Sequence, residues 1–210
     1  MNKYFNQLKI DIPLLKIEIP GLESLGPNLN FFYTQRLDVE TSINRDMLDF
    51  FANNGIYFDC CELLYSIPNF TGPIHRDLCP GEYSNLNMRQ HDIVKINWIF
   101  GGQGSTMNWY SIKSTVAKQV FTTAHDSVYM YYKPSELKLE CLADIGSLSL
   151  VQSGVPHTSQ TTGHYRYCVS LFPYTLEYNT KQRLTMEQAY TRLKKYLVPP
   201  EGIEPPSPRS

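Results

Sequence analysis

The sequence predicts a mainly β protein with one core and a few flanking helices. Aromatic residues make up 13% of its 210 positions, with fifteen Tyr and ten Phe, and these residue types favour strands. Short runs of β-branched and aromatic residues alternate with turns that contain Gly and Pro. A chain of this length can bury one sizeable core, so we expect a single domain over residues 1–198.

Residues 1–40 carry short apolar runs broken by prolines and glycines, which predict strands and turns packed on the core. A helix is expected over residues 45–53, because Asn44 can cap its N-terminus and Gly55 can end it. The apolar side chains of this segment recur at helical spacing: Met47, Leu48, Phe50 and Phe51. This helix should cover one face of the core, and residues 56–67 should form the first core strand.

A β-hairpin is expected next. Residues 93–100 alternate in polarity and predict one strand, and residues 105–112 predict the second strand. The glycines between them supply a turn. Further strands are expected at residues 116–121, 128–132 and 137–142.

The segment after Pro173 changes character, because Thr185 and Gln188 have the spacing of a capping box. Apolar residues follow at helical spacing: Met186, Ala189, Tyr190, Leu193 and Leu197. A helix packed on the sheet is therefore predicted. Residues 199–210 include five prolines and predict a disordered tail.

Charge and cysteine content narrow the choice of partners and compartment. The 19 basic and 20 acidic side chains balance, so no nucleic-acid or membrane partner is expected. The cysteines are odd in number and lack Cys-x-x-Cys spacing, which favours a reducing compartment: Cys60, Cys61, Cys79, Cys141 and Cys168. With no apolar run resembling a signal peptide or a membrane span, we predict a cytoplasmic protein of undetermined oligomeric state.

The segment His75-Arg76-Asp77 and the later His157 carry the chemistry of the chain. In a strand, His75 and Asp77 would point to the same face, since side chains alternate. Two imidazoles and one carboxylate can bind a non-haem Fe(II) on one side and leave the other side open. His157 follows a strand-like run at residues 148–153, and Arg166 opens another at residues 165–172.

On these residues the sequence resembles the Fe(II)- and 2-oxoglutarate-dependent dioxygenases, which share a double-stranded β-helix (jelly-roll, cupin-like) core. The resemblance covers roughly residues 56–175. The family pattern is His-x-Asp, a distal His and a basic residue on the last core strand. Here these positions are His75, Asp77, His157 and Arg166.

The resemblance implies Fe(II) at the triad and 2-oxoglutarate as co-substrate, with Arg166 holding its C5 carboxylate. Where the family often has Ser or Thr two positions after the arginine, this chain has Cys168, and Ser170 lies further along the same strand. Asn97 and Asn108 are further candidates for polar contacts to the co-substrate. The implied reaction consumes molecular oxygen and hydroxylates a prime substrate, either a peptide residue or a small metabolite.

The polar, turn-rich segment between residues 78 and 92 either covers the active site or is a solvated connection. In the first case its candidate contacts are Arg76, Tyr83, Arg89 and His91.

Two alternatives to the dioxygenase stay open. One is a metal-binding cupin-like jelly roll, an isomerase or a small-molecule sensor, without oxygenase activity. The other is a structural β-sandwich that acts as an interaction module, in which His75, Asp77 and His157 are unrelated in space. Fe(II) binding and conversion of 2-oxoglutarate into succinate would separate all three.

We predict that deletion of residues 200–210 leaves the melting temperature unchanged, because this segment has few apolar groups to bury and many prolines. Thermal unfolding of the full chain and the truncated chain provides the measurement. A large drop in melting temperature would mean that the tail docks on the core.

Overall fold

Two antiparallel sheets form most of the computed structural model, which describes residues 2–16, 32–78, 93–113, 119–122, 128–144, 147–177 and 179–199. The described part is mainly β, as the sequence predicts. The large sheet has the order β1-β10-β5-β12-β3-β2, with β13 paired to β12, and the small sheet has the order β7-β8-β4-β11-β6-β9.

The strands of the large sheet are β1 (Phe5–Gln7), β2 (Phe32–Leu37), β3 (Tyr57–Ser66), β5 (Val94–Gly101), β10 (Ser147–Gln152), β12 (Arg166–Glu177) and β13 (Thr180–Arg183). Those of the small sheet are β4 (His75–Leu78), β6 (Thr106–Ile112), β7 (Gln119–Thr122), β8 (Val128–Tyr131), β9 (Leu137–Asp144) and β11 (His157–Gln160). From β3 to β6, and again from β9 to β12, each strand lies in the opposite sheet to the one before it.

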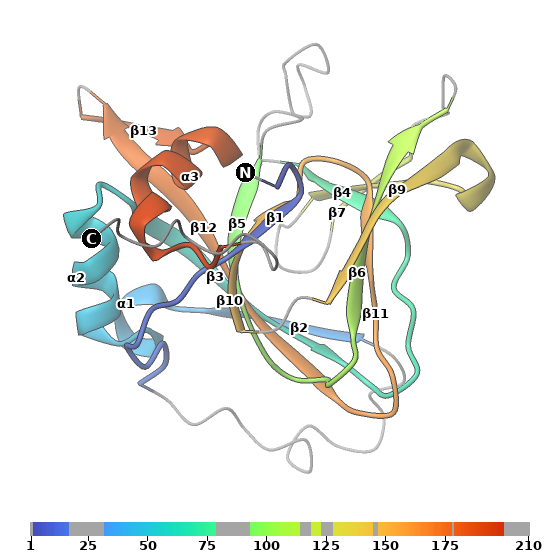
Figure 1. The fold of residues 1–210 in the computed structure, drawn as a ribbon, viewed down its shortest axis with the longest axis horizontal. Helices are drawn as coiled ribbons and strands as arrows, with labels where there is room; N and C mark the ends of the chain where they lie inside the picture. The colour runs from blue at the N-terminus through green and yellow to red at the C-terminus, as the bar shows by residue number, and fades with distance from the viewer. Residues whose placement is uncertain are drawn as a thin grey trace, which may run out of the picture.

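Three α-helices occur in the described residues, and Figure 1 shows them together on the side of the large sheet that faces away from the small sheet: α1 (Val39–Ser42), α2 (Arg45–Asn53) and α3 (Met186–Leu193). The bounds of α2 agree with the prediction, and the Asn44 side chain accepts a hydrogen bond from the Asp46 backbone N–H. The capping box of Thr185 and Gln188 is also present. The predicted last helix is too long, because α3 ends at Leu193 and a 3-10 turn, Lys194–Tyr196, follows it.

The large sheet is apolar on the face under the helices and largely polar on the face toward the small sheet. On β5, Val94 and Ile96 pack with helix residues such as Phe51 in one buried cluster. Their neighbours Lys95 and Asn97 point to the space between the sheets, where they line a cavity. Alternation along a strand therefore separates a face packed under the helices from a face that lines the cavity.

The expected β-hairpin of residues 93–112 is wrong. β5 pairs with β10 and β12 in the large sheet, whereas β6 pairs with β9 and β11 in the small sheet. The glycine-rich turn carries the chain from one sheet to the other, with Gly101, Gly102 and Gly104 all at positive φ. A Cβ at Gly101 would lie 2.6 Å from the Tyr165 carbonyl oxygen, so this crossing requires glycine.

The other strand predictions agree with the structure within a few residues: β3 matches residues 56–67, β8 matches 128–132 and β9 matches 137–142. Residues 17–31, 79–92, 114–118 and 200–210, with the predicted covering loop and the tail, lie outside the described residues. Where the structure is described, no helix has the length and apolar character needed to cross a membrane.

We predict that Phe51→Ala lowers the free energy of unfolding by about 3–5 kcal/mol, because it opens a cavity between α2 and the large sheet. Phe51 has no exposed surface, and its ring contacts those of Phe50 and Phe58 edge-on at centroid distances of 5.2 and 5.0 Å. Urea denaturation measures the loss. The control Asn53→Ala, on the exposed side of the same helix, should change stability by less than about 0.5 kcal/mol. Equal effects of the two substitutions would contradict this packing.

Candidate functional site

Two neighbouring strands of the small sheet bring the predicted triad together. β4 places His75 and Asp77 on one face, and His157 lies directly opposite His75 in the antiparallel pairing of β4 with β11. The two imidazole centroids are 4.5 Å apart, and His75 Nε2 lies 3.6 Å from Asp77 Oδ1. One ligand atom from each residue lies within 4.8 Å of the other two. This grouping excludes the alternative in which the three residues are unrelated in space.

Both imidazoles are held in a tautomer that leaves Nε2 free to bind a metal. The Nδ1 atom of His75 lies 2.9 Å from the Pro73 carbonyl oxygen, and that of His157 lies 2.9 Å from the Val155 carbonyl oxygen. A carbonyl oxygen only accepts hydrogen bonds, so each Nδ1 carries the proton and each Nε2 keeps its lone pair. Such contacts orient histidine ligands in known metal sites.

The protonation states also suit a cation. Burial lowers the pKa of His157 to about 4, and the neighbouring His75 acts in the same direction. Burial lowers the pKa of His75 as well. Burial alone would raise the pKa of Asp77, but the Lys95 ammonium and the nearby imidazoles outweigh it and bring this pKa to about 2. Near neutral pH the donor set is therefore two neutral imidazoles and one carboxylate.

The two oxygens of the Asp77 carboxylate differ in their surroundings. Oδ2 lies 2.9 Å from Lys95 Nζ, whereas Oδ1 is buried and accepts no hydrogen bond from any described residue. A buried carboxylate oxygen without a donor is costly, and a metal ion would satisfy it. Since Oδ1 is also the oxygen nearest His75 Nε2, the residues present fit a divalent cation bound by two nitrogens and one oxygen.

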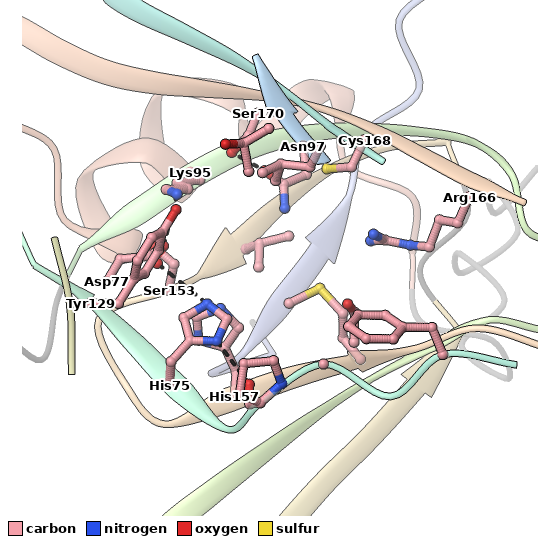
Figure 2. Close-up of a pocket in the computed structure, with 18 of the residues that line it drawn as sticks. His75, Asp77, Lys95, Asn97, Tyr129, Ser153, His157, Arg166, Cys168 and Ser170 are labelled. Carbon is pink, nitrogen blue, oxygen red and sulfur yellow. Dashed lines mark hydrogen bonds and ion pairs between the residues drawn. The ribbon is translucent and has the colours of Figure 1, made fainter. Parts of the chain in front are cut away.

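A cavity of about 360 Å³ lies between the sheets and has the triad in its wall. This size falls in the range of small-molecule sites. Figure 2 shows His75 and His157 on one side of it, Asn97 and Ser170 on another, and Asp77 and Arg166 at opposite ends. Much of the remaining lining is apolar or aromatic: Leu64, Phe70, Pro73, Met107, Tyr129, Tyr131 and Val151.

Arg166 is the first residue of β12 and lies in the cavity wall with only 5% of its surface exposed. Its guanidinium points into the cavity (Figure 2). Within the described part of the chain it forms no ion pair. A buried cation without a counter-ion is unfavourable, so this end of the cavity is suited to an anion.

The other predicted co-substrate contacts divide into two groups. Asn97 and Ser170 both line the cavity, and the Ser170 hydroxyl donates a 2.8 Å hydrogen bond to Asn97 Oδ1. Asn108 is absent from the described cavity wall, because β6 turns Met107 toward the cavity and places Asn108 on the other face with Thr106. The prediction placed Asn108 on the correct strand but on the wrong face of that strand.

Of the four residues predicted to contact substrate around the segment after β4, only Arg76 lies among the described residues. Arg76 is buried, alternates with the two ligand residues on β4 and is absent from the cavity lining. Tyr83, Arg89 and His91 lie outside the described residues.

Three residues at the site escaped the sequence interpretation: Lys95, Tyr129 and Tyr131. The Tyr129 and His75 rings are perpendicular with their centroids 5.0 Å apart, and Tyr131 lies opposite His75 on β8. Lys95 had one available signal, since it shares a strand face with Asn97 inside an otherwise apolar run. The tyrosines had none, because their position depends on the pairing of β4 with β8.

Fold and site together define a mainly β protein with a cavity between its two sheets that carries three residues of metal-ligand type. No protein-family model and no curated protein matches the chain. Among solved structures, peruvianin-I, a cysteine peptidase from Thevetia peruviana latex, is 9% identical, with a TM-score of 0.30 over 76% of this chain and 71% of that one. The E. coli protein ycfD is 15% identical, with a TM-score of 0.30 over 73% of this chain.

This chain spans 36% of the length of ycfD. Similarities at this level carry no argument about fold or function. The functional assignment therefore depends on the geometry of the chain itself.

We predict that His75→Ala, His157→Ala and Asp77→Asn each abolish tight binding of Fe(II) or Mn(II), because each removes one of the three donors. Isothermal titration calorimetry under anaerobic conditions measures the affinity, and thermal unfolding checks the fold. His164→Ala, at an exposed position away from the cavity, is the matched control and should bind metal as the parent does. Parent-like affinity in the His157 variant would remove this residue from the ligand set.

Proposed function

We propose that the protein is a non-haem iron dioxygenase that couples oxidative decarboxylation of 2-oxoglutarate to hydroxylation of a prime substrate. The observation that carries the proposal is the shared cavity: three metal-type ligands in one wall and the buried Arg166 guanidinium at the other end. A small molecule that chelates a metal at one end and carries a carboxylate at the other matches both features.

We also propose that the two sheets form a jelly roll, the core fold of that family. The large sheet contains the order β10-β5-β12-β3 and the small sheet the order β4-β11-β6-β9. Eight strands in two facing antiparallel sheets are typical of a jelly roll. Here the strands alternate between the sheets from β3 to β6 and from β9 to β12, and β6 pairs with β9 in the small sheet. The strands β1 and β2 extend the large sheet at its two edges, β7 and β8 extend the small sheet at one edge, and β13 pairs with β12.

The charges around the cavity support a dianionic co-substrate. Asp77, Lys95 and Arg166 line the cavity, and Glu62 lies behind Lys95, so two carboxylates balance two cations among these described residues. A divalent metal adds two positive charges, and a dicarboxylate cancels them. A neutral or monoanionic ligand would leave buried positive charge without compensation.

Each group has a defined role in this proposal. His75, Asp77 and His157 hold the iron, which when bound supplies the site for the 2-oxo acid and molecular oxygen. Arg166 makes two parallel hydrogen bonds to the C5 carboxylate, for which its planar guanidinium is suited. The Ser170 hydroxyl donates a hydrogen bond to Asn97 Oδ1, so Ser170 orients that amide. Cys168 lies two positions after Arg166 on β12, where the family often has Ser or Thr. The prime substrate is a peptide residue or a small metabolite.

The direct test is production of succinate from 2-oxoglutarate by purified protein with Fe(II) and oxygen. Turnover that requires all three components supports the dioxygenase. Metal binding without 2-oxoglutarate binding or succinate production would support a cupin-like metal protein, an isomerase or a small-molecule sensor. A mass-spectrometric screen for a gain of one oxygen atom would then identify the prime substrate.

We predict that Arg166→Ala leaves Fe(II) affinity nearly unchanged but weakens 2-oxoglutarate binding steeply. Loss of a bidentate charged pair in a dry pocket costs about 2–4 kcal/mol. This corresponds to roughly 30-fold to 1000-fold in the dissociation constant. Arg166→Lys should recover part of the loss, because it keeps the charge without the planar fork. Titration of 2-oxoglutarate into the metal-loaded variants measures the effect, and undiminished affinity in the Ala variant would assign this arginine a structural role.

A further inference from the structure

Lys95 connects the two sheets at the candidate metal centre. It extends from β5 of the large sheet, and its Nζ atom lies 2.9 Å from Asp77 Oδ2 on β4 of the small sheet. Only 6% of the Lys95 side chain and 7% of the Asp77 side chain are exposed, so solvent screens this contact weakly. The ammonium also lies 4.1 Å from the centroid of the Phe172 ring. Such contacts confine the ammonium to one position.

When a cation held in one position binds one oxygen of a carboxylate, the two carboxylate oxygens are no longer equivalent. A free aspartate can turn about its side-chain bonds and offer a metal either oxygen, or both. Here one oxygen is bonded to Lys95, and the other lies 3.6 Å from His75 Nε2. Interactions of this kind with the outer side of a ligand fix its orientation and tune the metal.

Glu62 supplies the charge balance for this arrangement. Its Oε2 atom lies 3.9 Å from Lys95 Nζ, and its side chain is 3% exposed. One buried cation beside a single carboxylate would cancel the negative charge that attracts a metal. With two carboxylates on one ammonium, the group keeps one net negative charge.

We propose that Lys95 is a positioning residue of the metal centre, which holds Asp77 Oδ2 so that Oδ1 alone is presented to the metal, while Glu62 balances its charge. This inference depends on the metal site of the proposed function. A one-oxygen ligand leaves more of the coordination sphere open toward the cavity, where Arg166 anchors the far end of the co-substrate.

The test uses a variant that removes the contact and keeps the net charge. The double variant Lys95→Met/Glu62→Gln deletes one positive and one negative charge, so the net charge around the site stays the same. Replacement of a buried ion pair by neutral groups is often tolerated, so this variant should fold. Glu62→Gln alone is the matched control, since it keeps the contact between Lys95 and Asp77.

Co(II) serves as the probe, because its visible absorption spectrum reports the number and arrangement of its ligand atoms. We expect the double variant to bind Co(II) about 10- to 100-fold more weakly than the parent and with an altered spectrum. Glu62→Gln should keep the parent spectrum. Lys95→Met alone removes the same contact and should show the same altered spectrum. Thermal unfolding checks that each variant folds. If one of the two Lys95 variants fails to fold, the spectrum of the other still tests the proposal.

Parent-like affinity and an unchanged spectrum in a folded Lys95 variant would overturn the positioning role while leaving the metal site intact. Failure of the parent to bind Co(II), or equal binding by His157→Ala, would instead overturn the metal site itself and this inference with it. Metal binding by the parent without 2-oxoglutarate binding or turnover would refute only the dioxygenase.

Discussion

The pairing of β4 with β11, with His75 opposite His157, is the constraint on which the candidate site depends. Since side chains alternate along a strand, a slip of one residue would turn either imidazole away from the cavity. The Asp77 backbone N–H donates to the Ser153 carbonyl oxygen at 2.9 Å, just before the segment that leads into β11. The backbone thus fixes all three ligand positions before any metal is bound, and the two carbonyl contacts at Nδ1 fix the imidazole tautomers.

The large sheet can carry a buried polar face because its other face supplies the apolar core. Residues such as Ile96, Val169 and Leu171 pack beneath the helices, and their neighbours on the same strands line the cavity. Buried charges normally destabilise a protein unless they are paired. Here Lys95 lies between Asp77 and Glu62, whereas Arg166 forms no ion pair with any described residue. The two buried cations therefore differ, because one is paired and the other is suited to an anion.

Local signals predicted the parts of the structure that depend on neighbouring residues. The caps of α2 and α3, and the shared face of His75 and Asp77, follow from short-range rules. Strand partners depend on contacts between distant segments. The alternation of polar and apolar residues therefore predicted the strands β5 and β6, but the prediction that they pair in one hairpin was wrong. Asn108 was misplaced for the same reason, since the face of β6 toward the cavity depends on its pairing with β11.

The two sheets divide the chemistry of the site between them. The small sheet carries the three metal-type ligands, and the large sheet carries Lys95 and Arg166. The distance from the His75, Asp77 and His157 group to Arg166 is therefore set by how the sheets face each other rather than by either sheet alone. The contact between Lys95 and Asp77 spans that gap at the metal end, so it links ligand orientation to the spacing that a co-substrate must fit. In this arrangement, packing under the helices contributes to the geometry of the site, because it fixes the strands that deliver both cations.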